Sequence, residues 1–580
     1  MNNNIFIMSL KCNFKNKKVL FCIYILFKIL LVLIPTVTLY FNNHLYNYLI
    51  TSFDKITVIS YLIGYLASSI LLASTFRYLS NVISIKLKDY STIEAKRMFN
   101  TYIVNLDYEL MEDNNIYNDM NVMRSIYTDL IASYVFDLLE IIFDMGTLIS
   151  VLVYLFTLKM PILVIIILLI SSLYYFVIKN NNTSVYYDRL RKIPEIRQSN
   201  YLYRILSNRN SLKEIKTDDS SNYILHEWKS KRKRIINETK KLKFRTLYKK
   251  IYIDLIYYIA FCLILLFLFF KLKSTDINIG VFTSLYYGFI EINGLVIGLL
   301  VSTIFLNLQI KDYKEKIYLL NKKEKKEQKV IFENNIKLEN IKYQYPNSPK
   351  EVIDDLSLSI LKGQKIGIVG ENGCGKTTLI KIILGLLTPQ SGKIKINDEE
   401  VKEYKILNIS GLFQNFVSYA ASIKDSVVIS EKIDNDKLAK IYRTVKLEQV
   451  IERLELKDDT TIGQVFPNSI ELSGGEKQRL AFARCLYRDN AELYFLDEPT
   501  SSLDVNFEID VYKTFLEELK NKTLIMVSHR LAFTKFMDKI IVMDKGKVIE
   551  CGTHNELMEI KGHYYNMYTK QLELIKGIGD

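Results

Sequence analysis

Long apolar segments dominate the first half of the chain and stop near Asn307. A helix needs about 20 apolar residues to cross a bilayer core about 30 Å thick. About six such segments can be drawn, so we expect an α-helical transmembrane domain of the same number of spans. The segments are Val19–Phe41, Ile56–Tyr78, Ala132–Leu158, Pro161–Ile178, Ile251–Leu272 and Ile279–Phe305.

The connections between these spans differ strongly in charge. The long stretch Lys179–Lys250 contains about 20 Lys and Arg against about 7 Asp and Glu, and the connection after the second span is also long and basic. Basic loops favour the cytoplasmic side of a membrane, so we expect both stretches and both ends of the chain there. This topology accounts for most of the net charge of +14. The charge therefore indicates a membrane-lipid surface and no nucleic-acid partner.

The sequence changes character near residue 325. Beyond the polar linker Lys311–Lys329, short β-branched runs alternate with amphipathic segments, as in an α/β domain. We therefore expect a transmembrane domain with its linker over residues 1–325 and an α/β domain over residues 326–580. A soluble ATPase of translation or DNA repair is excluded, because such proteins carry no apolar half of this length.

The stretch "KIGIVGENGCGKTTLIKIILG" reads as a strand, a glycine-rich loop and a helix. This is the P-loop pattern in its required context, where backbone N–H groups curl around a phosphate. Lys376 is expected to reach the β- and γ-phosphates and Thr377 to bind Mg²⁺. Cys374 is read as a small tolerated residue, although a bulky group on its thiol is expected to collide with the phosphates. The expected nucleotide contacts are Gly370, Glu371, Asn372, Gly373, Cys374, Gly375, Lys376, Thr377 and Thr378.

Two carboxylates follow an apolar strand in "AELYFLDEPTSSLD". Asp497 at the strand tip is expected to hold Mg²⁺ through water. Glu498, one residue further, is expected to polarise the water that attacks the γ-phosphate of ATP. A P-loop followed by such a pair predicts an α/β nucleotide-binding domain that hydrolyses ATP.

Taken in order, the motifs of residues 336–568 resemble the ATP-binding cassette (ABC) family. They are the P-loop, the glutamine of "GLFQNF", the signature "LSGGE", the Asp-Glu pair, "SSLD" and "MVSHR". The resemblance implies that Ser473 and Gly475 of the signature bind the γ-phosphate of an ATP held by a second cassette. It places Tyr345 on the adenine, with Tyr343 as the alternative. It also implies a catalytic and metal-contacting role for Gln414, a nucleotide contact for Asp504 and a catalytic role for His529.

One cassette and about six spans make half of a transporter of the exporter type. The resemblance therefore implies a dimer with two ATP molecules held between two cassettes. The presence of Glu498 and His529 favours hydrolysis at both sites of a homodimer, and a heterodimer stays open. Short cytoplasmic helices around Asn114–Met120 and Thr217–Tyr223 are the expected couplers to the spans.

The stretch "DDTTIGQVFPNSIELSGGE" lacks the T-x-x-G-E-x-G pattern of many multidrug and lipid exporters. Gln464 and Phe466-Pro467 replace its later part, as in the lantibiotic and bacteriocin exporter branch. That resemblance implies export of a cationic peptide from the cytoplasm across a bacterial plasma membrane. A multidrug or lipid exporter is the alternative.

Acidic residues inside the expected spans indicate the transport path. Three carboxylates of the third span recur at spacings of three and four, so they share one helix face. A charge at membrane depth favours a water-filled cavity, which for carboxylates suits cationic cargo. The alternatives are pairing with Lys28 or Arg77 and solvation of a cytoplasmic leg. The candidate path residues are Asp137, Glu140 and Asp144, together with Glu291 of the sixth span.

Overall fold

The computed structural model divides the chain by its contacts into two units. The first consists of residues 1–104 and 119–321, and the second of residues 105–118 and 322–580. The boundary expected near residue 325 stays a prediction, and the short segment 105–118 groups with the second unit. The residues described are 5–14, 17–51, 54–158, 165–166, 192–273, 278–319, 327–346, 348–429, 431–463, 466–498, 513–528 and 530–577.

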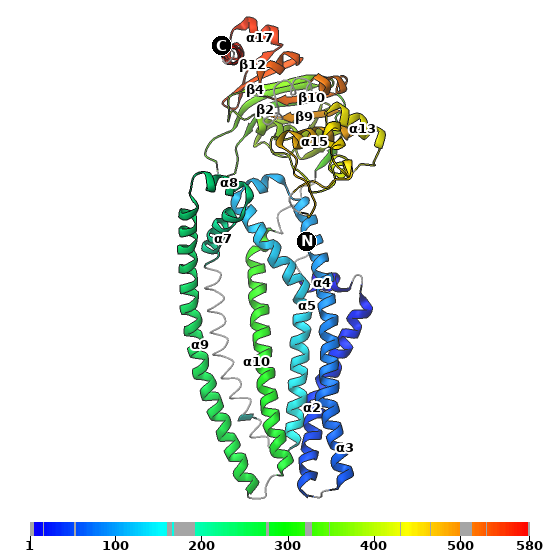
Figure 1. Ribbon diagram of the computed structural model, residues 1–580, viewed down its shortest axis with the longest axis vertical. Coiled ribbons are helices and arrows are strands. Elements are labelled where there is room, and N and C mark those ends of the chain that lie inside the picture. The colour runs from blue at the N-terminus through cyan, green and yellow to red at the C-terminus, as the bar shows by residue number, and fades with distance from the viewer. Residues whose placement is uncertain are drawn as a thin grey trace. The chain divides into compact units, whose positions relative to one another are not determined.

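Long helices make up the first unit (Figure 1). Among the described residues, five helical stretches are long and apolar enough to cross a membrane, by length and composition. The expected fourth span, Pro161–Ile178, lies outside the described residues apart from 165–166. The helices are α1 (Ile5–Phe14), α2 (Lys18–Thr51), α3 (Lys55–Leu66), α4 (Ala73–Val104), α5 (Asn114–Thr157), α7 (Ile193–Ser207), α8 (Arg209–Thr217), α9 (Ser221–Lys273), α10 (Ile279–Lys316) and the 3₁₀ turn η3 (Ile317–Leu319).

Several of these helices extend well past their apolar stretches. Helix α9 has 53 residues, which at about 1.5 Å per residue makes it about 80 Å long. Its polar half is rich in Lys and Arg, which are good helix formers, and the whole element contains neither Gly nor Pro. Nothing in the sequence therefore ends the helix between its polar and apolar halves.

A π-helical turn, η1 (Ala67–Leu72), interrupts the second apolar stretch between α3 and α4. Such a turn leaves backbone carbonyls without their usual α-helical partners. The hydroxyls of Ser68 and Ser69 donate to the carbonyl oxygen of Tyr65 at 3.1 and 2.6 Å. Just before the turn, a Cβ on Gly64 would lie 2.4 Å from Cε1 of Phe41. Only glycine therefore lets α3 approach α2 this closely.

Aromatic and aliphatic side chains hold four of the long helices of the first unit together. A buried cluster joins residues of α2, α5, α9 and α10, and includes Leu39, Leu155 and Tyr257. Within it, the rings of Phe261 and Phe289 stack with centroids 4.1 Å apart. Lipid tails are as apolar as these side chains, so no hydrophobic force drives helices together inside a membrane. Dispersion contacts and close packing of this kind hold them together instead.

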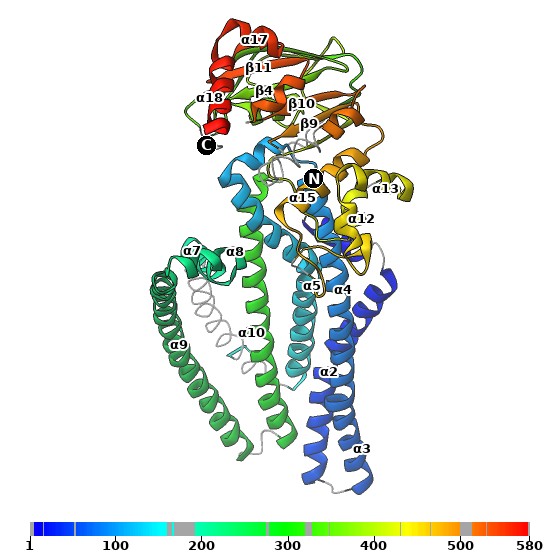
Figure 2. The same cartoon turned by 45° about the horizontal axis from the view of Figure 1, so that its top comes forward.

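The second unit is built on three β-sheets (Figure 2). The six-stranded sheet has the order β12-β11-β4-β10-β9-β8, and β4 pairs in parallel with β10 and β11. Its strands are β4 (Lys365–Gly370), β8 (Ile409–Leu412), β9 (Leu493–Asp497), β10 (Thr523–Val527), β11 (Lys539–Asp544) and β12 (Lys547–Gly552). The four-stranded sheet orders β3 (Ile353–Leu361), β2 (Asn335–Tyr343), β5 (Ser391–Ile396) and β6 (Glu399–Val401), and a third pairs β1 (Gln328–Val330) with β7 (Tyr404–Ile406).

Helices and turns cover these sheets, and the central strands β9 and β10 are fully buried. Buried parallel strands read as continuous apolar runs, as "LYFLD" and "TLIMV" do. Ligands of such sheets bind beyond the carboxyl ends of the strands. The helices and 3₁₀ turns of this unit are η2 (Tyr108–Glu112), α11 (Lys376–Ile383), α12 (Ile423–Val428), α13 (Asn435–Thr444), α14 (Glu448–Glu452), η4 (Lys457–Asp459), α15 (Gly474–Tyr487), η5 (Leu531–Phe536), α17 (His554–Ile560) and α18 (His563–Gly577).

Candidate nucleotide site

The P-loop connects the carboxyl end of β4 to the first turn of α11, as the sequence predicts. Gly373 and Gly375 have φ angles of +82° and +103°, in the left-handed region that favours glycine. A Cβ on Gly375 would also lie 2.9 Å from the carbonyl oxygen of Val352. The loop conformation therefore depends on these glycines, and its backbone leads into the N-terminus of α11, where an anion is favoured.

Lys376 is buried, with an exposed fraction of 5%. Its Nζ donates hydrogen bonds to the carbonyl oxygens of Gly370 and Glu371 at 2.9 and 2.8 Å. The ammonium group is thus held over the loop by oxygens of the loop itself. Three residues predicted to contact the nucleotide, Glu371, Asn372 and Gly373, are exposed at the surface of the loop. A fourth, Thr378, is buried in the first turn of α11.

A magnesium ion fits the pair formed by Thr377 and Asp497. The Thr377 hydroxyl donates to Asp497 Oδ1 at 3.3 Å, and Asp497 Oδ2 is buried with no hydrogen-bond partner. Burial is the largest influence on this carboxyl group and raises its pKa, with the charge of Glu498 adding to the effect. A buried oxygen that lacks a partner, beside a hydroxyl, is the hard-oxygen environment that Mg²⁺ takes.

Glu498, the residue after Asp497, is joined to Gln414 by a hydrogen bond. The Gln414 side-chain amide donates from Nε2 to Glu498 Oε2 at 2.8 Å. Glu498 has a φ of +47°, and its N–H donates to the carbonyl oxygen of Val527 at 3.0 Å. A non-glycine residue in this backbone region is strained, and such strain is concentrated at functional sites. The strand end thus turns the Glu498 side chain away from the core and towards Gln414.

The two tyrosines proposed for the adenine occupy different environments. Tyr343 is fully buried and its hydroxyl donates to Glu109 Oε1 at 3.2 Å. Tyr345 is half-buried, and its hydroxyl lies 3.1 Å from the Thr378 hydroxyl beside the P-loop. The rings are 5.1 Å apart and perpendicular. Tyr345 is therefore the better placed of the two, and its role stays a prediction.

The signature motif forms the start of α15. Ser473 is the N-cap of this helix, and it shares a reciprocal capping box with Glu476. Glu476 also forms an ion pair with Arg453. Although burial raises the pKa of Glu476, the hydrogen bonds from Ser473 and the charge of Arg453 outweigh it and lower that pKa. Glu476 thus stabilises the start of the helix. Ser473 is exposed there.

The Cys374 side chain is buried beneath the P-loop, with its Sγ 3.9 Å from the Nζ of Lys376. Its exposed fraction is 4% and it belongs to the apolar core formed by β2, β3 and α11. Burial raises the pKa of its thiol, against the opposing charge of Lys376. Burial should slow the reaction of this thiol with reagents, and the expected collision of a bulky thiol adduct with the phosphates stays a prediction.

Segment 105–118 contacts the P-loop helix through residues that sequence reasoning did not select. Lys381 on α11 pairs with Glu112 at 2.7 Å, and its Nζ lies 5.3 Å from the ring centroid of Tyr108. The Tyr343 hydrogen bond to Glu109 comes from the same turn, η2. These contacts precede the expected coupler at Asn114–Met120. A cluster of acidic residues before a helix start, "DYELMED", is the only sequence signal for them.

The predicted path residues lie on α5 and α10 of the first unit. Asp137 pairs with Lys88 at 3.8 Å and accepts from the Ser133 hydroxyl at 2.8 Å. Glu140 pairs with Lys28 at 3.8 Å. For Asp144 and Glu291, no hydrogen bond or ion pair to another described residue is found. Two of the four carboxylates are thus neutralised, and the partner Lys88 was not among the expected ones. Asp504 and His529 lie outside the described residues.

A family model described as ABC transporter matches residues 353–501. The chain is 32% identical over 394 residues to the subtilin transport ATP-binding protein SpaT of Bacillus subtilis, covering 64% of this chain and 62% of that protein. It is 30% identical to the nisin transport ATP-binding protein NisT of Lactococcus lactis, covering 64% of each. The alignments thus span somewhat less than two thirds of these relatives.

Two further similarities concern the cassette and the fold. The ATP-dependent lipid A-core flippase of Alkalilimnicola ehrlichii is 33% identical over 242 residues, which is 41% of this chain and 40% of that protein. A solved structure of a bacterial Atm1-family ABC exporter with ATP bound superposes with a TM-score of 0.76 at 18% identity. It covers 95% of this chain and 99% of the other. The predicted fold, helical spans followed by an α/β P-loop domain, is confirmed by this likeness.

Proposed function

We propose that this chain, which carries an ABC transporter domain and has the fold of an ABC exporter half-transporter, hydrolyses ATP to drive export. The observation that carries the proposal is the meeting of four side chains at the carboxyl ends of β4, β8 and β9: Thr377 with Asp497, and Gln414 with Glu498. One pair suits a metal ion at the phosphates and the other suits a water beside them.

In the proposed reaction, Glu498 accepts a proton from water as the water oxygen bonds to the γ-phosphorus. The bond from that phosphorus to the bridging oxygen breaks, and ADP and phosphate leave. Lys376 and the loop N–H groups hold the phosphates. Mg²⁺ held by Thr377 and Asp497, with Gln414 beside them, would neutralise phosphate charge.

A second copy of the chain is the proposed partner. Ser473, which is exposed, and Gly475, which is half-buried, stand at the start of α15, where the helix dipole favours an anion. We assign that anion to the γ-phosphate of ATP held by the other cassette. A closed two-fold dimer then contains two equivalent ATP sites.

We propose that the chain is a multi-pass plasma-membrane protein with a cytoplasmic nucleotide-binding domain, and its long apolar helices and exporter fold support this. We propose a cationic peptide as the cargo. The similarity to the subtilin and nisin transport proteins extends beyond the cassette into the membrane half. The half-buried carboxylates Asp144 and Glu291, which have no described ion-pair partner, suit positive charge.

A lipid is the second candidate cargo. Its support is the cassette similarity to the lipid A-core flippase and the neutralisation of Asp137 and Glu140 by lysines. A path with few free carboxylates suits an uncharged or zwitterionic cargo as well as a cation.

Inside-out vesicles that contain the full chain test the proposal. ATP should drive a fluorescent cationic peptide into the lumen, and a Lys376→Ala variant should not support uptake. A neutral peptide of equal length and a fluorescent phospholipid are the comparison cargoes. Uptake of the phospholipid alone would favour the second candidate. Failure of every cargo to accumulate, with ATP hydrolysis intact, would remove the export proposal.

A further inference from the structure

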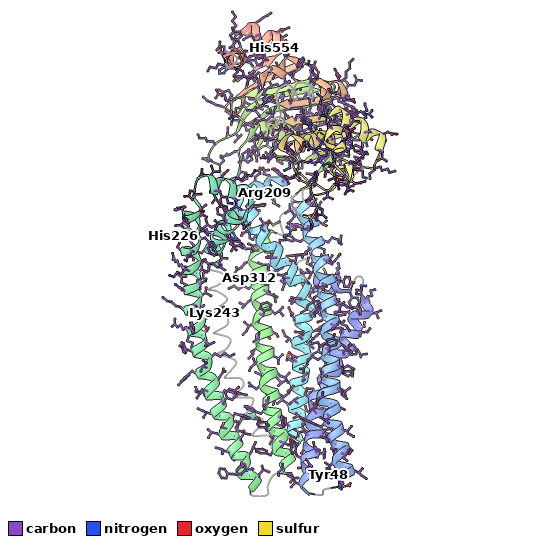
Figure 3. The ribbon with its side chains drawn as sticks, viewed as in Figure 1. Tyr48, Arg209, His226, Lys243, Asp312 and His554 are labelled. Carbon is purple, nitrogen blue, oxygen red and sulfur yellow. The ribbon has the colours of Figure 1, made fainter. Side chains whose placement is uncertain are left out.

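A cavity of about 790 Å³ lies along the polar half of α9, with α7 as its other wall. Its lining positions on α9 run from Arg232 to Leu247 and, at about 100° per residue, form one broad stripe over roughly half of the helix circumference. Figure 3 shows Lys243 on α9, between His226 and the apolar half of the helix. The stripe is about 22 Å long, about half the thickness of a bilayer.

The stripe carries basic and apolar side chains together, with Ile235 and Ile236 next to Arg232. Arg232, Lys240 and Lys243 lie along its first two thirds, and Phe244 and Leu247 line its far end. The long apolar run of α9 begins four residues later, at Ile251. The last cation of the cavity, Lys243, is therefore followed by apolar lining alone in the direction of the apolar half of α9.

The positive charge in this cavity is not balanced by nearby carboxylates of the described chain. Lys192, which is 7% exposed, is matched by Glu238 at 3.7 Å. Neither Arg232 nor Lys243 has a carboxylate within ion-pair distance among the described residues. The Nζ of Lys240 lies 5.7 Å from the ring centroid of Phe244. Three cations thus line a cavity that also offers apolar surface.

We propose that this cavity binds one anionic phospholipid. The headgroup phosphate contacts Lys240, Lys243 and Arg232, and the acyl chains lie along Phe244 and Leu247 towards the membrane. Basic side chains next to a spanning segment attract anionic lipids, and their long aliphatic stems extend over apolar surface. A cationic cargo is repelled here, so the site is separate from the proposed transport path.

Lipid retention by the full-length protein tests the site. The protein is reconstituted in nanodiscs of phosphatidylcholine with or without phosphatidylglycerol, and the phosphatidylglycerol that remains bound after extraction is counted by native mass spectrometry. The double variant Lys240→Gln/Lys243→Gln should retain about tenfold less. It should also lose any stimulation of ATP hydrolysis by phosphatidylglycerol. In pure phosphatidylcholine its hydrolysis should equal that of the parent.

The variant Lys241→Gln/Arg245→Gln is the matched control, since it removes two charges at the same depth on another face of α9. An equal loss in this control would overturn the proposal in favour of diffuse surface attraction. Thr239→Trp keeps the charges but fills the middle of the stripe, and it should also lower retention. Unchanged retention in both Thr239→Trp and Lys240→Gln/Lys243→Gln would overturn the site. Full displacement by glycerol 3-phosphate would identify a plain phosphate site instead of a lipid site.

Discussion

Glu498 is held in its strained backbone by Val527 and faces Gln414. We predict that Glu498→Gln lowers ATP turnover by about 10²- to 10⁴-fold, because the water loses its proton acceptor. Binding of ATP should persist, since Lys376 and Thr377 are unchanged. Phosphate release and binding of a fluorescent ATP analogue measure the two effects. Glu455→Gln, a carboxylate exposed elsewhere in the unit, serves as the control. Parent-like phosphate release by Glu498→Gln would exclude this residue as the base.

The buried thiol of Cys374 gives a second prediction for a single residue. We expect N-ethylmaleimide to modify Cys374 at least about tenfold more slowly than the exposed Cys551, because only an accessible thiolate reacts quickly. Since burial raises the Cys374 pKa above its ordinary value of 9.0, the rate should keep rising above pH 9. Peptide mass spectrometry of timed samples measures both rates. Denaturant should remove the difference, and equal rates in the native protein would contradict the shielding.

At the scale of elements, the contact between η2 and α11 joins segment 105–118 to the helix that follows the P-loop. We predict that Lys381→Glu or Glu112→Lys alone lowers cargo uptake per ATP hydrolysed, because each places like charges side by side. The double swap should restore most of it, with an interaction free energy of about 1 kcal/mol for this partly buried pair. Burial raises the Glu112 pKa, but the Lys381 and Tyr108 hydrogen bonds lower it overall. The pair should therefore weaken only as pH falls through that lowered value.

The exposed pair Lys393 and Glu400, 2.9 Å apart on the four-stranded sheet, is the control for this swap. Its single reversals should leave uptake unchanged. If the double reversal lowers uptake by the sum of the two single effects, the Lys381 and Glu112 pair does not couple ATP hydrolysis to transport.

Elements differ in how far the sequence predicts them. Apolar runs are local patterns, and so are the strand, glycine loop and helix around Lys376. The sequence therefore predicts the P-loop and the five spans that the described residues contain. Which side chains pair across elements is decided by tertiary packing. Asp137 is paired with Lys88 of α4 and not with Lys28 or Arg77. The inward direction of Cys374 likewise depends on the core beneath the loop, which no local pattern specifies.

For the whole molecule, the path residues predict a cargo preference. The variant Asp144→Asn/Glu291→Gln should lower uptake of a cationic peptide about tenfold, since no described ion pair neutralises either carboxylate. The lysine-paired Asp137 and Glu140 are the matched comparison, and Asp137→Asn/Glu140→Gln should have a smaller effect on cargo. Uptake is measured in vesicles at matched protein levels. Equal uptake by the first variant and the parent would move the proposal to a lipid cargo.

The proposed two-fold dimer predicts how mixtures behave. Co-reconstitution of equal amounts of parent and Glu498→Gln chains should leave about a quarter of the transport if both sites must hydrolyse ATP. About half would remain if each site works alone. Cross-linking of single cysteines placed at Ser473 and at the exposed Asn372 should join two chains, and a strictly monomeric product would contradict the dimer.

The π-helical turn at Ala67–Leu72 amounts to one residue more than an α-helix of the same path would need. In a continuous α-helix each residue adds about 100° of rotation. The spare residue therefore changes the rotational phase of α4 relative to α3, in which Gly64 faces Phe41. Deleting Ser69 should restore regular α-helical hydrogen bonds through the turn. It should also rotate the side chains of α4 by about 100° relative to those of α3. The span therefore consists of two α-helices whose side-chain faces are rotated relative to each other. Where they join, the hydroxyls of Ser68 and Ser69 bond to the carbonyl oxygen of Tyr65.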